Sequence, residues 1–228
     1  PSSISPIAAN LLVVANENSG TVAVYAMESE RKTYEMHQTF TPSAVEAADH
    51  LLIWSAFGNG GKDDGQTSND FISIYNPTDS AVELAGYKVR YSTLRDGGER
   101  EWTEIELNGS LAAGGYYIII GSDTGNENPL ISFAEGEYDI KYEFEIDNKQ
   151  YSIQLVNASG QVVDALGVDK DESDENAELA EGSPIVGINK HTVVVRTDAS
   201  DTDNNALDFI KVDLEVNPDL ADEYKPVK

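Results

Sequence analysis

LLIWSAFGNGGKDDGQTSNDFISIYNP, residues 51–77, places two short apolar segments on either side of a loop rich in glycine and aspartate. Runs of four to eight β-branched, aromatic and aliphatic residues bounded by Gly, Asn, Asp or Pro are typical of β-strands. The second run ends at Asn76 and Pro77, a pair that favours a turn because proline fixes φ and the asparagine side chain bonds to nearby backbone. The stretch therefore predicts two short strands joined by an irregular loop.

The same pattern recurs along most of the remaining chain. Seven further runs are typical of short strands: YKVRYS (87–92), WTEIEL (102–107), GYYIII (115–120), YEFEI (142–146), YSIQLVN (151–157), QVVDALG (161–167) and HTVVVRT (191–197). Nine short strands separated by turn residues predict an all-β, antiparallel sandwich or barrel. We expect one shared buried face that contains Ile72, Ile74, Leu84, Val89, Leu111, Ile118, Ile120, Ile153, Leu155, Val163, Val193 and Val195. Trp54 and Trp102 are expected to complete this core or its rim.

An N-terminal segment stands apart from this series. Residues 10–27, NLLVVANENSGTVAVYAM, alternate apolar and polar residues around a turn at Asn18, Ser19 and Gly20, which predicts a β-hairpin. The composition changes near residue 40. The predicted organisation is an N-terminal hairpin segment (1–40), a linker (41–49), the sandwich (50–219) and a C-terminal tail (220–228). Because the chain starts at Pro1 without a leader pattern, we expect it to be part of a longer protein.

Several segments, in order, resemble the lamin tail domain family. After residues 51–77, the landmarks are VELAGYKV (82–89), SLAAGGYYIII (110–120), IQLVNASGQVVDALG (153–167) and VVVRTDASDTDNNALDF (193–209). The resemblance covers about residues 50–219. It implies an immunoglobulin-like β-sandwich, which bacteria use as an accessory module of secreted or surface proteins. Residues 10–27 separately resemble one hairpin of a β-propeller blade, which implies an upstream propeller domain.

The chain is strongly acidic, because 41 Asp and Glu residues against 15 Lys and Arg residues give a formal net charge of −26. Direct binding to nucleic acid or anionic membrane needs clustered basic residues, so neither is an expected partner. No apolar run reaches about 20 residues, which predicts no transmembrane segment. The expected partners are other domains of the same precursor, another protein, or a second copy paired through the hairpin edges. The resemblance implies an extracellular or cell-surface location in bacteria.

The sequence contains no recognisable catalytic motif. Cysteine is absent, the three histidines lie in unrelated contexts, and no H-E-x-x-H, G-x-S-x-G or glycine-rich phosphate loop occurs. We therefore predict a non-catalytic accessory module that mediates positioning, adhesion or protein–protein interaction. Two alternatives remain open: an extracellular hydrolase domain that uses carboxylates or a metal, and a carbohydrate-binding module that uses aromatic residues such as Tyr91, Trp102, Tyr116 and Tyr117.

Three acidic loops are candidates for Ca²⁺, which takes six to eight oxygen ligands. The principal loop, DASDTDNNALDF, supplies Asp198, Asp201, Asp203, Asn205 and Asp208. The other two loops supply secondary cation candidates at Asp63, Asp64, Asp70, Asp169, Asp171 and Asp174. An EF-hand is excluded, because Ala206 and Val212 stand where that loop requires glycine and a bidentate glutamate.

The principal loop also has an interpretation without a metal. Asp and Asn side chains bond to backbone two residues on, and so they close tight turns by themselves. In that case Arg196 pairs with Asp203 or Asp208 and the loop simply fixes the last strand. The sequence slightly favours this turn over the calcium site.

Overall fold

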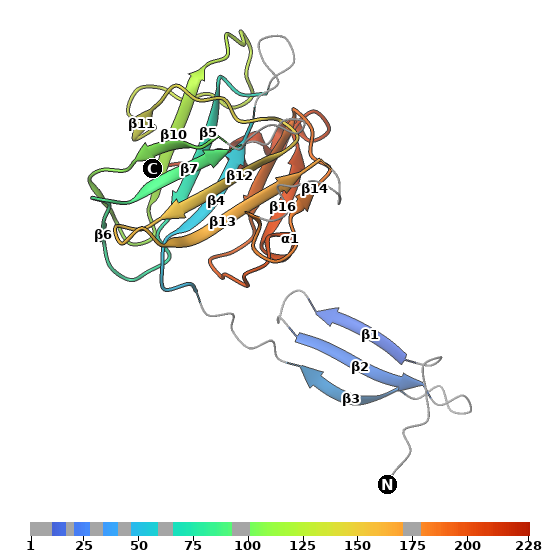
Figure 1. Ribbon diagram of the computed structural model, residues 1–228. Coiled ribbons are helices and arrows are strands. Elements are labelled where there is room, and N and C mark those ends of the chain that lie inside the picture. Colours follow the sequence, from blue (N-terminus) through green and yellow to red (C-terminus); the bar gives the residue numbers. More distant parts are fainter. Residues whose placement is uncertain are drawn as a thin grey trace. The chain divides into compact units, whose positions relative to one another are not determined.

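The structure is a computed structural model that describes residues 11–16, 21–27, 34–40, 47–58, 66–92, 101–170 and 179–228 (Figure 1). The chain divides into two compact units, Pro1–Glu46 and Ala47–Lys228. Each unit forms its own sheets, and the short helices α1 (Asn205–Asp208), η2 (Pro218–Leu220) and α2 (Ala221–Tyr224) follow β15 in the second unit.

The first unit contains a three-stranded antiparallel sheet. Its strands are β1 (Leu11–Asn16), β2 (Thr21–Met27) and β3 (Tyr34–Phe40), with β2 in the middle. β1 and β2 pair from Asn16 and Thr21 outward, so the predicted hairpin is confirmed. The third strand lies outside that prediction, although apolar residues alternate along it at Tyr34, Met36 and Phe40. A third strand matters because an isolated two-stranded hairpin is only marginally stable in water.

The second unit is a sandwich whose two sheets face each other (Figure 1). The first sheet has six strands in the order β11-β10-β5-β4-β15-β16. These strands are β4 (Leu52–Phe57), β5 (Asn69–Tyr75), β10 (Tyr116–Asp123), β11 (Ile140–Lys141), β15 (Thr192–Arg196) and β16 (Phe209–Asp213). Neighbouring strands are antiparallel except for the short pairing of β10 with β11.

The facing sheet has five strands in the order β14-β13-β12-β7-β8, and β6 pairs separately with β9. Their bounds are β6 (Val82–Glu83), β7 (Lys88–Ser92), β8 (Thr103–Glu106), β9 (Ser110–Leu111), β12 (Tyr151–Val156), β13 (Val162–Asp169) and β14 (Ile185–Val186). Only β13 and β14 run parallel in this sheet. The predicted all-β, immunoglobulin-like antiparallel sandwich is confirmed. The strand predicted at residues 142–146 is not present, although Phe144 and Ile146 are buried in the core.

The main core lies between the two sheets. Of the predicted core residues, it contains Ile72, Ile74, Leu84, Val89, Leu111, Ile153 and Leu155, with Val163 packed against it. Ile118, Ile120, Val193 and Val195 instead belong to a second apolar cluster on the outer face of the six-stranded sheet. The prediction of one shared face is wrong for these four residues. Strands covered on both faces are apolar at consecutive positions, so their sequence does not show which side points inward.

The C-terminal segment helps to cover the second cluster. It contains η2 (Pro218–Leu220) and α2 (Ala221–Tyr224), and Leu220, Ala221 and Tyr224 pack against the outer face of the sheet. Part of the predicted C-terminal tail therefore belongs to this cover. Trp54 packs at the rim of the same cluster, whereas the ring centre of Trp102 lies 4.4 Å from the guanidinium carbon of Arg90.

Candidate functional site

A buried ion pair joins the two sheets of the sandwich at one end of the core. On β15, Val194 lies in the main core, and Arg196, two residues on, points to the same side. On β13, Asp164 precedes the core residue Leu166 by the same spacing. Nη2 of Arg196 lies 2.9 Å and 3.1 Å from the two carboxylate oxygens of Asp164, and neither side chain is exposed to solvent. The alternation of the two strands thus aims opposite charges at each other across the core.

The ion pair also satisfies backbone groups of β4. β4 and β15 pair only through Ala56 with Val194 and Ser55 with Val195, so Ile53 lies beyond their ladder. The backbone N–H of Ile53 donates to Asp164 over 2.5 Å, and its carbonyl accepts from Nε of Arg196 over 3.1 Å. Buried backbone groups must find partners, so the ion pair replaces two strand-to-strand hydrogen bonds.

The rest of the Arg196 guanidinium faces the loop that follows β15. Nη1 donates to the carbonyl of Ser200 over 2.9 Å and lies 3.3 Å from Asp208 and 3.7 Å from Asp201. The guanidinium carbon also lies 4.6 Å from the ring centre of Phe209. Arginine suits such a position because its planar fork serves several acceptors at once and stacks on aromatic rings.

Glu181 places an additional carboxyl group in this charge cluster, which we define as Asp164, Glu181, Arg196, Asp201 and Asp208. Carboxylate oxygens of Asp164, Glu181 and Asp201 lie within 4.8 Å of one another. Burial raises the pKa of Glu181 to about 9, and the charges of Asp164 and Asp201 add to this effect. Burial also raises the pKa of Asp164 to about 6, although Arg196 acts in the opposite direction. Glu181 therefore carries a proton at neutral pH, which limits the repulsion around one arginine.

The structure disperses the five candidate ligands of the principal loop. Asp201 and Asp208 turn towards Arg196, whereas the fully buried Asn205 turns towards β13. There its amide donates to the carbonyl of Ala165 and accepts from the N–H of Gly167, at 2.7 Å and 2.8 Å. Asp198 is exposed and accepts a hydrogen bond from the backbone N–H of Ser200. Asp203 is also exposed. Asp203 has a positive φ of 51°, which fits a turn.

The donor set of this loop fits a turn better than a calcium ion. The carbonyl oxygen of Asn205 is already used, and Asp201 and Asp208 already face a guanidinium. The loop also closes on itself, because Asp201 accepts from the N–H of Asp203 and Asp208 accepts from both the N–H and the hydroxyl of Thr202. Few oxygens remain for an ion that takes six to eight.

Replacing both Asp201 and Asp203 by alanine is expected to lower the free energy of unfolding by about 1–3 kcal/mol, because charge-assisted hydrogen bonds are lost. The loss should be equal with and without calcium. Thermal unfolding measured at constant ionic strength, with magnesium as a second control, checks this expectation. A calcium-selective rise in the Tm of the parent protein that disappears in the variant would contradict it.

The secondary candidates do not form a common site among the described residues. Asp63, Asp64, Asp171 and Asp174 lie outside the described residues. Asp70 is buried and accepts a hydrogen bond of 2.6 Å from the N–H of Ile146. Asp169 is fully buried at the end of β13.

Sequence reasoning missed three participants of the site: Asp164, Glu181 and His50. Nε2 of His50 lies 3.0 Å from a carboxylate oxygen of Asp201, whose side chain is only 9% exposed. A signal existed for Asp164, since a carboxylate inside an apolar strand must find a partner. Glu181 and His50 carry no comparable signal, because they lie outside any strand.

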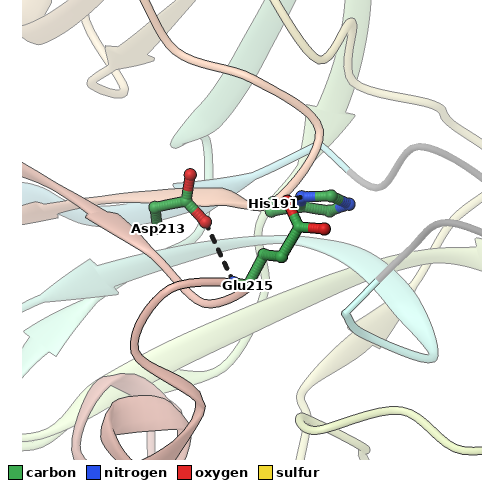
Figure 2. A group of neighbouring side chains, drawn as sticks. All are labelled: His191, Asp213 and Glu215. Carbon is green, nitrogen blue, oxygen red and sulfur yellow. Dashed lines mark hydrogen bonds and ion pairs between the residues drawn. The ribbon is translucent and has the colours of Figure 1, made fainter.

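A second group of potential metal ligands lies at the other end of β15 and β16 (Figure 2). Nδ1 of His191 lies 2.8 Å from Glu215, and Asp213 accepts from the backbone N–H of Glu215 over 2.9 Å. The other carboxylate oxygen of Asp213 accepts from the amide of Asn189 over 2.8 Å. These hydrogen bonds satisfy the group as a turn at the end of the strand.

Comparison with known proteins agrees with the architecture. The model of the Lamin Tail Domain family matches residues 44–170, which include β4 to β13 and therefore Asp164 but not Arg196. A search of curated proteins finds no match. In the described part of the chain, no helix has the length and apolar character needed to cross a membrane. The ordered landmarks, the sandwich and the match over more than half of the sequence agree: the chain belongs to the lamin tail domain family.

Proposed function

We propose that this chain is a non-catalytic module of a secreted or cell-surface protein, in which it positions neighbouring domains or binds another protein. The observation that carries the proposal is the enclosure of Asp164, a carboxyl group whose pKa is raised by burial. Asp164 has no exposed surface, and its oxygens contact Arg196 and the backbone of Ile53. A general acid or base must reach its substrate, and a carboxylate held in this way does not.

Membership of the lamin tail domain family is compatible with this role. A β-sandwich does not by itself imply an enzyme, because activity depends on the site that the fold carries. The separate N-terminal unit supports a role in a multidomain protein. Among the described residues β1 and β3 are the outer strands of its sheet, and outer strands favour pairing with a neighbouring domain or a second copy.

The alternative function, a carboxylate-dependent hydrolase, has one observation in its favour. Asp164 and Glu181 have raised pKa values and lie close together, as the carboxyl groups of an acid–base pair often do. They line neither of two surface cavities, of about 460 Å³ and about 220 Å³, although Arg196 lines the larger one.

The purified protein is expected to show no turnover of phosphoester, ester or glycoside substrates, because the carboxyl groups with raised pKa values, Asp164 and Glu181, line neither of the two cavities. Chromogenic substrates of each class, assayed between pH 5 and 9, test this expectation. The matched control is Glu181→Gln, which removes the titrating proton and keeps the shape of the side chain. Turnover by the parent protein that this variant abolishes would establish the hydrolase instead.

A further inference from the structure

A cavity of about 460 Å³ lies on the outer face of the six-stranded sheet, beside the C-terminal segment. The sheet contributes Trp54, Tyr116, Val195 and Ile210 to its lining, and the C-terminal segment contributes Tyr224 and Pro226. This volume lies within the range of about 300–1,000 Å³ that is typical of ligand sites. Arg196 of the charge cluster also lines the cavity, whereas the carboxyl groups of that cluster do not.

A β-bulge presents Trp54 to this cavity. Along β4, Ile53 pairs with Ile74 and Ser55 pairs with Ser73, so Trp54 is the extra residue between two paired positions. Bulges redirect side chains and are common next to functional sites. The ring of Trp54 meets that of Tyr116 at a centroid distance of 5.6 Å and an angle of 73°. The two rings therefore form a corner rather than a flat platform.

The polar tips around this corner are available to a ligand. Within the described residues, neither the indole N–H of Trp54 nor the hydroxyls of Tyr116 and Tyr224 make a hydrogen bond to the protein. Such groups usually find a partner when they are covered. A ligand that supplies carbonyl acceptors and compact apolar rings would satisfy both features of the cavity.

The C-terminal segment of the chain itself places a proline flanked by lysines at the edge of the cavity. Pro226 is buried there, and Lys225 before it has extended backbone angles, with φ −68° and ψ 119°. Lys225 pairs with Glu137 at 2.9 Å, and Lys228 pairs with Asp139 at 2.7 Å. The surface thus accepts an extended Lys-Pro-Val-Lys segment with its proline buried and its lysines on carboxylates.

We propose that this cavity binds a proline-rich segment with basic flanks from another protein, in the polyproline II conformation. Such segments are preorganised and dock into aromatic-lined grooves, where side-chain donors bind their carbonyl groups. Pyrrolidine rings fill the corner between Trp54 and Tyr116. The net charge of −26 favours lysine or arginine on either side of the prolines, although the lining itself holds Arg196 and Lys225 beside Glu223. The proposal rests on the proposed function and names its partner class.

Nuclear magnetic resonance of the ¹⁵N-labelled 228-residue chain tests the proposal, because its two tryptophans give two indole N–H signals. Titration with the peptide Lys-Pro₆-Lys is expected to shift the Trp54 signal in a saturable way and to leave the Trp102 signal unchanged. Fluorescence anisotropy with the labelled peptide then compares Trp54→Phe with the matched control Trp102→Phe. Loss of the Trp54 donor should weaken binding about two- to tenfold, and the control should bind normally.

Two further probes separate this ligand from others. Lys-Gly₆-Lys has the same charge without the preformed helix, and cellohexaose is a neutral saccharide that also stacks on aromatic rings. Equal binding of the glycine peptide, a Trp54 shift with the saccharide alone, or no shift with any probe would overturn the proposal. If the peptide does not bind and the protein shows no turnover, only this inference fails. Turnover would overturn the proposed function whatever the peptide does.

Discussion

Replacing Arg196 by methionine is expected to lower the free energy of unfolding by about 3–5 kcal/mol, the usual cost of removing one partner from a buried ion pair. The variant leaves Asp164 without its cation and leaves the carbonyl of Ile53 without a donor. The free energy of unfolding of Arg196→Lys should lie between those of the parent and of Arg196→Met. The lysine ammonium keeps the positive charge but does not reproduce the planar set of donors of the guanidinium. Chemical denaturation at pH 7 measures each difference.

A matched control comes from the surface ion pair between Lys88 and Glu104, 2.7 Å apart and partly exposed. Lys88→Met should cost no more than about 1 kcal/mol, as is usual for exposed pairs. A loss below about 1 kcal/mol for Arg196→Met as well would contradict the structural role assigned to the charge cluster.

Replacing Glu181 by glutamine is expected to flatten the pH dependence of stability between about pH 5 and pH 9. Burial raises the pKa of Glu181 to about 9, well above the unfolded value of about 4.3. In this window the folded state holds a proton that the unfolded state lacks, so stability is full at low pH and is lost as the pH rises. Glutamine stays neutral, and its oxygen can still accept from the N–H of Ala165.

The difference between the two proteins is therefore expected to grow with pH. At pH 9 the glutamine variant should be more stable than the parent by at least about 1.4 kcal/mol, the equivalent of one pKa unit. Solvent screening at this partly exposed carboxyl group reduces the difference below the full effect of the raised pKa. Glu83→Gln, at an exposed position on β6, should follow the parent curve. Parallel curves for Glu181→Gln and the parent would show that Glu181 titrates normally.

The strands of the sandwich could be predicted from the sequence because local alternation and turn residues determine them. The direction in which a central strand faces could not be predicted in the same way. Val193 and Val194 are both apolar and both buried, yet they belong to different clusters. Each face of the six-stranded sheet is covered by a different part of the chain. The five-stranded sheet packs against the face that contains Val194, and the C-terminal segment helps to cover the face that contains Val193.

The charge cluster could be predicted only in part. The sequence makes Asp203 and Asp208 candidate partners of Arg196, and of these two the structure places Asp208 beside it, at 3.3 Å. The stronger partner, Asp164, lies on the facing sheet, so its choice depends on the register of the whole sandwich. The contact between His50 and Asp201 spans 151 positions in the sequence and depends on the same long-range arrangement. The spacing of residues along the sequence does not predict pairs that are this far apart in the chain.

The most direct test of the central claim, that Asp164 and Arg196 clamp the two sheets together, is a double-mutant cycle. The free energies of unfolding of the parent, Asp164→Asn, Arg196→Met and the double variant are measured at pH 7 under one set of conditions. Residues in one hydrogen-bonded ion pair couple by about 0.5–3 kcal/mol. We predict a coupling energy of about 2 kcal/mol or more, so that the double variant loses less stability than the sum of the two single losses. Losses that add to within about 0.5 kcal/mol would show that the two residues act independently and would contradict the claim.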